Sequence, residues 1–210
     1  MLDLVLDIIG VSAFAVSGAM VAIRRRADLF GVLFLALVTA LGGGVIRDLL
    51  LGQTPPRMFT SYVYMAVAVG CALLVFLAAR FNLERYRAGE ARLEAVDNFF
   101  DAIGLAAFTV SGSTVAIDAF GMENPILIVA MGMTTGFGGG MLRDTMTNSM
   151  PMVLCKRVYA VASLAGALAY YALLRLGVGA LICDLVGMAT VFTLRMLATR
   201  YKWNLPKVDL

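Results

Sequence analysis

The sequence predicts an all-α membrane protein whose seven transmembrane helices form a 3+3 inverted-topology repeat plus one extra C-terminal helix. Three observations lead to this fold class. The chain is 61% hydrophobic and 15% charged, whereas soluble domains are roughly 45–50% apolar and about 25% charged. Its apolar residues form uncharged runs of about 18 residues, which suit a helix that crosses a hydrocarbon core about 30 Å thick. Two long motifs also occur twice at matched spacing.

The candidate spans follow one another along a single transmembrane domain, residues 1–210. The first carries Asp3 and Asp7 where a cleavable leader would be basic, so we expect it to be a true span. The last has the weakest signal, because Asp184 and Arg195 shorten its uncharged run. We place the spans at residues 4–23, 29–52, 58–79, 99–117, 124–147, 153–174 and 178–198.

Basic residues gather in the links on the side of the membrane opposite to the N-terminus. That side receives Arg24–Arg26, Arg80, Arg85, Arg87, Arg92, Lys156, Arg157, Arg200, Lys202 and Lys207. The N-terminal side receives only Arg57 and Arg175. Because cytoplasmic loops carry an excess of Lys and Arg, we predict that the N-terminus lies outside and the C-terminus in the cytoplasm.

The second half of the chain repeats the first. The segment from Asp7 to Ile23 aligns with the segment from Asp101 to Ile117, at an offset of 94 residues. The segment from Gly42 to Asp48 aligns with that from Gly138 to Asp144, at an offset of 96 residues.

Each copy holds three predicted spans. Residues 3–79 form repeat 1 and residues 99–175 form repeat 2, a basic cytoplasmic linker at 80–98 joins them, and residues 178–198 form the seventh helix. Because three is odd, the second copy begins on the opposite side of the membrane from the first. Such inverted repeats place a site near the bilayer midplane, at the interface of the two halves.

Each copy carries the motif Gly-Gly-Gly-x-x-Arg-Asp in its second span. Glycine within a helix costs up to about 1 kcal/mol relative to alanine, so three in a row predict a kink or local unwinding. Backbone groups freed within the hydrocarbon must find partners or line a wet cavity. Alternatively, the glycines allow close helix packing, and both roles can hold together. The candidate pore-kink residues are Gly42, Gly43, Gly44, Gly138, Gly139 and Gly140.

The charges within the spans form a second set of candidates. Intramembrane charges usually face the interior of a bundle or water, although these could instead reach the interface as anchors. The second span ends on the side where the first begins, so we predict an ion pair between Asp7 and Arg47, and by symmetry one between Asp101 and Arg143. The pore-adjacent charged candidates are Arg47, Asp48, Arg143, Asp144, Asp7 and Asp101.

Hydroxyl side chains at mid-span form a third set. They could replace part of the hydration shell of a cation, or bond back to the carbonyls of their own helix. A pore of this kind would be uncharged at its centre. The candidates are Ser17, Thr39, Ser111, Thr134 and Thr135.

The sequence argues against catalysis. It contains no histidine, and Cys71, Cys155 and Cys183 show no metal-ligand spacing. No nucleophile–base constellation or phosphate-binding Gly-x-x-x-x-Gly-Lys motif occurs. We expect no enzyme activity, catalytic residue, metal site or nucleic-acid partner.

The paired Gly-Gly-Gly-x-x-Arg-Asp motifs and the repeated Asp-x-Ile-Gly-x-x-x-Phe-x-x-Ser-Gly segments closely resemble the prokaryotic trimeric intracellular cation (TRIC) channels, also labelled bacterial glycine transporters. The resemblance covers residues 3–198. It implies a homotrimer in the prokaryotic plasma (inner) membrane, with one pore in each seven-helix protomer, beside second and fifth helices kinked at the triple glycines. It also implies no cofactor, a permeant potassium or sodium ion, and membrane lipids as partners, including bound lipid.

Two main functions fit these observations. The first is a passive, potassium-permeable channel for monovalent cations. The second is a secondary transporter for glycine or another small zwitterion, whose carboxylate would face half-helix N-termini. A structural or lipid-organising role is a third alternative.

Overall fold

The computed structural model describes residues 2–81, 90–155 and 158–203. Within these ranges the chain forms nine helices and no strand. The helices are α1 (Leu2–Arg24), α2 (Leu29–Leu50), α3 (Arg57–Thr60), α4 (Tyr62–Phe81), α6 (Glu90–Phe120), α7 (Pro125–Met146), α8 (Met152–Cys155), α9 (Tyr159–Arg175) and α10 (Ala180–Arg200). Several of the basic residues used above lie outside the described residues, namely Arg85, Arg87, Lys156, Arg157 and Lys207.

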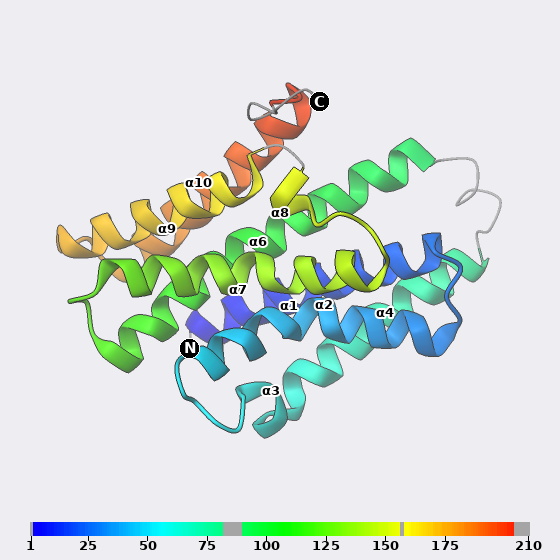
Figure 1. Cartoon of the computed structure of the whole chain (residues 1–210), viewed down its shortest axis with the longest axis horizontal. Helices are drawn as coiled ribbons and strands as arrows, with labels where there is room; N and C mark the ends of the chain where they lie inside the picture. Colours follow the sequence, from blue (N-terminus) through cyan, green and yellow to red (C-terminus); the bar gives the residue numbers. More distant parts are fainter. Residues whose placement is uncertain (1, 82–89, 156–157, 204–210) are drawn as a thin grey trace.

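Six of the described helices are long and apolar enough to cross a membrane, namely α1, α2, α4, α6, α7 and α10. The apolar helix α9 is shorter, with 17 residues. The long helices and α9 run alternately in opposite directions through the bundle (Figure 1). The chain is therefore an all-helical membrane protein.

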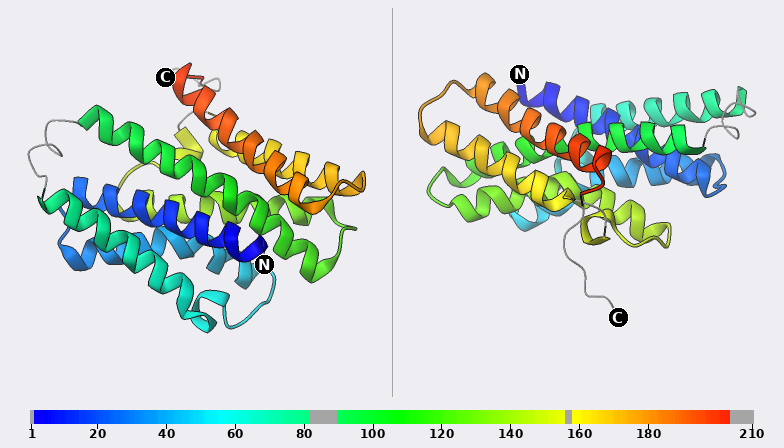
Figure 2. Two further views of the ribbon diagram at one scale, coloured as in Figure 1. Left: turned by 180° about the vertical axis from the view of Figure 1, so that it is seen from behind. Right: turned by 90° about the horizontal axis from the view of Figure 1, so that it is seen from above.

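Four helices form the core of the bundle. Each of α1, α2, α6 and α7 packs against two neighbours in the ring α1–α2–α7–α6. Helix α4 packs on α1 and α2, whereas α9 and α10 pack on the α6 and α7 side (Figures 1 and 2). We call the end of the bundle where α1 begins the near end, and the end where α1 finishes the far end.

Equivalent caps start the second helix of each sequence repeat. The Asp28 carboxylate accepts a hydrogen bond from the Gly31 backbone N–H at 2.8 Å and begins α2. The Asn124 side-chain oxygen accepts one from the Leu127 N–H at 3.0 Å and begins α7. Such side chains satisfy backbone donors that have no partner within the first turn.

The structure differs from the predicted spans in two ways. Helix α6 begins at Glu90 and not at residue 99, so residues 90–98 of the predicted linker are helical, while residues 82–89 lie outside the described residues. Helices α4 and α9 begin several residues later than predicted, because α3 and α8 form separate short helices before them.

The triple glycines lie where α2 crosses α7. A methyl group on Gly43 would lie 2.3 Å from the Thr135 carbonyl oxygen, and one on Gly139 would lie 2.0 Å from the Thr39 carbonyl oxygen. Both helices remain α-helical through their glycines. The predicted local unwinding is therefore wrong, and close packing is confirmed as the role of these glycines here; the kink stays a prediction.

A second reciprocal contact joins α1 to α6. The Phe14 ring covers Gly104, and the Phe108 ring covers Gly10, where added methyl groups would lie 2.4 Å and 2.6 Å from the rings. The two rings have centroids 5.5 Å apart. Small residues thus allow both helix pairs of the core to approach closely.

This packing predicts that Gly139→Ala destabilises the protein by about 1–3 kcal/mol, because the added methyl group overpacks the crossing against a backbone oxygen. At roughly 2–4 °C per kcal/mol, the melting temperature of the purified protein in detergent should fall measurably. The matched control is Gly70→Ala in α4, where an added methyl group meets no heavy atom within 4 Å. Equal melting temperatures for the two variants would contradict the close crossing.

Candidate functional site

Two cavities open into the four-helix core from opposite ends. The far-end cavity has a volume of about 580 Å³. It is lined by Val21, Arg24, Arg25, Glu94, Asp97, Asn98, Arg143, Asp144, Thr147, Ser149, Met150, Met152 and Cys155. The near-end cavity, of about 40 Å³, is lined by Asp7, Val11, Ala40, Leu41, Gly44, Val45, Arg47, Asp48, Arg57, Met58, Tyr64 and Phe108. Even the smaller cavity exceeds the roughly 10–15 Å³ that one water requires.

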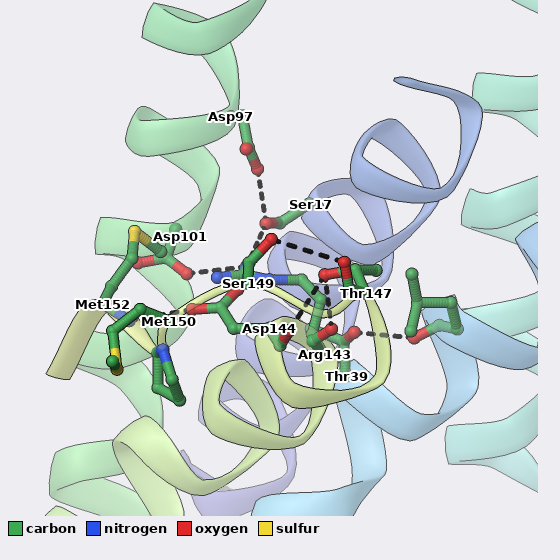
Figure 3. A network of polar contacts seen from close by, with 12 residues as sticks. Ser17, Thr39, Asp97, Asp101, Arg143, Asp144, Thr147, Ser149, Met150 and Met152 are labelled. Atoms are coloured by element: carbon green, nitrogen blue, oxygen red, sulfur yellow. Dashed lines mark hydrogen bonds and ion pairs between the residues drawn. The ribbon is translucent and has the colours of Figure 1, made fainter. Parts of the chain in front are cut away.

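Arg143 lies at the inner boundary of the far-end cavity, with 1% of its surface exposed. Its Nη1 donates to Asp101 Oδ1 at 2.9 Å and to Ser17 Oγ at 2.7 Å, and its Nε donates to Asp144 Oδ1 at 2.9 Å (Figure 3). The predicted ion pair between Asp101 and Arg143 is therefore confirmed. Two carboxylates compensate this buried guanidinium, as a buried charge requires.

Helix α1 links this ion pair to a second one. Ser17 Oγ accepts from Arg143 and donates to Asp97 Oδ1 at 2.5 Å (Figure 3). Asp97 also pairs with Arg24, from the last turn of α1. A continuous chain of polar contacts therefore joins α6 to α7 through Ser17 of α1, along the wall of the far-end cavity.

Helices α9 and α10 supply further residues on the other side of Asp101. Arg195 of α10 is 2% exposed, and its Nη2 lies 3.8 Å from Asp101 Oδ2. Its guanidinium also lies over the Tyr159 ring of α9, 4.4 Å from the centroid, which is within the range of a cation–π interaction.

The near end is arranged differently. Asp7 Oδ1 accepts from Ser111 Oγ at 2.5 Å, and Asp7 Oδ2 accepts from the Tyr64 hydroxyl at 3.1 Å. Arg47 donates to Asp48 Oδ1, from Nε at 2.9 Å and from Nη2 at 2.7 Å. Within the described part of the chain, no ion pair joins Asp7 to Arg47, so that prediction is wrong. Hydroxyl groups satisfy Asp7 and the adjacent carboxylate satisfies Arg47, although both side chains line one cavity.

The aspartate of each Arg-Asp pair also fixes a short helix. Asp48 Oδ2 accepts from the backbone N–H of Arg57 at 2.9 Å, at the start of α3. Asp144 Oδ2 accepts from the backbone N–H of Met152 at 2.9 Å, at the start of α8. Each motif therefore holds its arginine and anchors the chain that follows at the cavity entrance.

The mid-span hydroxyls divide into two groups. Thr39 and Thr135 are fully buried and donate to carbonyl oxygens of their own helices, Leu35 at 2.6 Å and Met131 at 2.7 Å. Ser17 and Ser111 instead bind carboxylates, while Thr134 is half-buried. Back-bonding is thus confirmed for the two threonines, which lie in the packed centre between the cavities.

The predicted glycines differ in their surroundings. Gly44 lines the near-end cavity. A methyl group on Gly140 would lie 3.3 Å from the Tyr159 hydroxyl, beside Arg143. The structure therefore brings the predicted charged residues together in two clusters, one at each end of the core, with Gly44 and Gly140 beside them. The other four predicted glycines lie at the crossing of α2 and α7.

Sequence reasoning did not single out Asp97, Arg195 or Tyr159 as site residues. Asp97 lies four residues before Asp101, and residues four apart share one face of a helix. Arg195 is an intramembrane charge, a signal that by default indicates a functional site. Nothing in the sequence around Tyr159 distinguishes it from the other aromatic residues of the spans.

Comparisons with other sequences identify relatives in bacteria. A family model described as "Glycine transporter" matches residues 4–80 and 98–175. The chain is similar to the "UPF0126 membrane protein" of Deinococcus radiodurans, with 47% identity over 164 residues that cover 77% of this chain and 72% of that protein. It is also similar to the "UPF0126 inner membrane protein YadS" of Escherichia coli, with 35% identity over 205 residues that cover 96% of this chain and 93% of that protein.

Comparisons of the fold identify solved channel structures. A prokaryotic TRIC channel crystallised in 0.5 M KCl matches with a TM-score of 0.87 and 32% identity, over 98% of this chain and 99% of that chain. The TRIC trimeric intracellular cation channel orthologue from Rhodobacter sphaeroides matches with a TM-score of 0.85 and 33% identity, over 96% of this chain and 98% of that chain. The two likenesses extend over nearly the whole fold.

The unequal charge clusters predict unequal effects of two equivalent substitutions. Arg143→Gln leaves Asp101 and Asp144 without their shared cation, and breaking a buried ion pair costs about 3–5 kcal/mol. Arg47→Gln should cost less, because Asp7 keeps both hydroxyl donors and Asp48 keeps the Arg57 N–H. Thermal unfolding of the two variants in one detergent measures the difference. Equal losses would indicate that the two ends are held in the same way.

Proposed function

Because this chain belongs to the prokaryotic TRIC channel family, whose family model is described as "Glycine transporter", we propose that it is a passive, potassium-permeable channel for monovalent cations. The relatives with solved structures are cation channels, and the protein is not an enzyme. The observation that carries the proposal is the pair of cavities, each with charged side chains on its wall, that enter one four-helix core from opposite ends.

The pore runs between α1, α2, α6 and α7, beside the triple glycines. Acidic side chains line both entrances: Asp7 and Asp48 at the near end, and Glu94, Asp97 and Asp144 at the far end. Carboxylates at the mouth of a narrow passage raise the local concentration of cations. Arginine side chains also line both entrances and pair with some of these carboxylates. A carboxylate attracts a cation most strongly once its arginine has moved away from it.

The packed centre corresponds to a closed pore. Opening requires α2 and α7 to separate or bend at Gly43 and Gly139, where only backbone atoms and hydrogen-sized side chains meet. The carbonyl oxygens of Thr39 and Thr135 face this crossing. Once the helices part, these oxygens line the passage and replace part of the hydration shell of a cation.

The repeat organisation gives this pore its symmetry. We place α1, α2 and α4 in repeat 1 and α6, α7 and α9 in repeat 2, with α10 as the seventh helix outside the symmetry. The reciprocal contacts Gly43–Thr135 and Gly139–Thr39 support an inverted relationship between the halves. The distribution of basic residues supports a near end that faces outward and a far end that faces the cytoplasm.

The relatives support a proposal for the oligomeric state. The Rhodobacter sphaeroides orthologue is described as trimeric, so we propose a homotrimer in the plasma (inner) membrane with one pore in each protomer. Exposed apolar side chains on α4 and α10 face neighbouring protomers or lipid. They include Leu74, Phe81, Leu181, Ile182 and Leu185.

One observation favours a second candidate, a carrier for glycine or another small zwitterion. The far-end cavity has a volume of about 580 Å³ and presents both Arg25 and Glu94 on its wall. Such a cavity offers a cation for a carboxylate and a carboxylate for an ammonium group.

A planar-bilayer recording of the purified protein distinguishes the two candidates. We expect unitary currents in symmetrical potassium chloride, smaller or comparable currents in sodium chloride, and no competition by added glycine. Saturable glycine uptake into proteoliposomes without unitary currents would replace the channel with the carrier.

The position of the pore can be tested by cysteine modification. In a background without Cys71, Cys155 and Cys183, we expect Gly44→Cys to react with a charged, membrane-impermeant thiol reagent added from the outside, and the bound group to reduce the potassium current. The control is Leu74→Cys in α4, an apolar position that faces lipid or a neighbouring protomer, where we expect neither reaction with the charged reagent nor a change in current. Reaction at Gly44→Cys without loss of current would place the pore elsewhere.

A further inference from the structure

Asp101 lies between two arginines and fully uses only one of them. Its Oδ1 accepts from Arg143 Nη1 at 2.9 Å. Its Oδ2 has no hydrogen-bond partner among the described residues and lies 3.8 Å from Arg195 Nη2. The Asp101 side chain is completely buried, so this oxygen has no exposure to solvent that would satisfy it.

Arg195 is equally underused. Its Nε is buried and has no hydrogen-bond partner in the described part of the chain. The guanidinium is held in place by the Tyr159 ring, 4.4 Å away. Arg195 Nε is therefore an unsatisfied donor, and Asp101 Oδ2 is an unsatisfied acceptor. The two oppositely charged groups approach to 3.8 Å, between Arg195 Nη2 and Asp101 Oδ2. The bidentate arrangement, with two parallel N–H···O bonds, is the strongest that an arginine and a carboxylate can form.

We infer that Arg195 is the reserve partner of Asp101, which takes over this carboxylate when Arg143 leaves it as the pore opens. The inference rests on the proposed channel function and names a positioning residue for its gate. Breaking a buried ion pair is strongly destabilising, because it leaves an uncompensated charge. A second arginine already in place reduces that penalty at Asp101.

The departing arginine also keeps a partner. Arg143 Nε donates to Asp144 Oδ1 at 2.9 Å, and the two residues are adjacent on α7. When α7 moves, Arg143 and Asp144 move together, while Asp101 stays on α6 against α10. Each charge is therefore compensated both before and after the exchange.

Among the described residues, the near end has no second arginine in reserve within ion-pair distance of Asp7. Asp7 is satisfied by the hydroxyls of Ser111 and Tyr64. Arg195 comes from α10, which has no counterpart in the repeated sequence. The exchange thus gives α10 a role in gating, because it supplies the second arginine that neither repeat contains at this position.

Single-channel recording of Arg195→Gln tests the inference. We expect the open probability to fall by about tenfold or more, which corresponds to about 1.4 kcal/mol, with an unchanged unitary conductance because Arg195 lines neither cavity. Arg195→Lys should restore part of the loss, since an ammonium group can still pair with Asp101. The matched control is Arg200→Gln, an exposed arginine five residues further along α10. An unchanged open probability, or a reduced unitary conductance, would overturn the inference.

A second readout does not depend on channel activity. In an Arg143→Gln background, Arg195 is the remaining cation beside Asp101, so Arg195→Gln should lower the melting temperature by more than it does in the wild type. A double variant that fails to fold, while both single variants elute as folded protein, is the extreme form of this result. Strictly additive losses would contradict the takeover. Absence of unitary currents from the wild type would contradict the proposed channel, and this readout would still decide the pairing.

Discussion

The close crossing of α2 and α7 determines the shape of the rest of the molecule. Gly43 and Gly139 each lie against a carbonyl oxygen of the other helix. A methyl group added to either glycine would overlap that oxygen. The crossing lies between the two cavities. Residues of α2 line the near-end cavity, and residues of α7 line the far-end cavity. Polar and charged side chains can therefore lie within the span of the membrane, because they face these cavities and not lipid.

The two ends share a backbone plan but differ in how their charges are satisfied. At both ends an aspartate holds the preceding arginine and anchors a short helix. Beyond this, Arg143 reaches across to Asp101 and Ser17, whereas Arg47 pairs with its neighbour alone. The far end also gains Arg195 from α10. An ion pair in a low-dielectric setting is stable only while every charge keeps a partner, so the end with more partners can rearrange without stranding a charge.

Much of this arrangement could be predicted from the sequence, because the repeated motifs indicate which residues lie at the same depth in the membrane. The offset motifs place Asp101 and Arg143 at the same end of the core, and they do form an ion pair. The same argument failed for Asp7 and Arg47, since depth does not specify which of several nearby groups satisfies a charge. Ser111 and Tyr64, from other helices, occupy the oxygens of Asp7. Asp97 and Arg195 escaped notice for the same reason: their partners come from helices distant in the sequence. Composition also cannot separate a glycine that breaks a helix from one that allows close packing.

These two roles of glycine are connected. At this crossing Gly43 and Gly139 meet backbone atoms of the partner helix, and the Leu142 side chain packs over Gly42. The dispersion energy of such a contact is spread over many weak atom pairs. The buried ion pairs at the ends hold far more energy per contact, and removing one partner is costly. The charged clusters therefore lie at the C-terminal ends of α2 and α7, while close packing joins the two helices at the crossing. In the channel that we propose, the exchange of partners at Asp101 is the step that allows α2 and α7 to part.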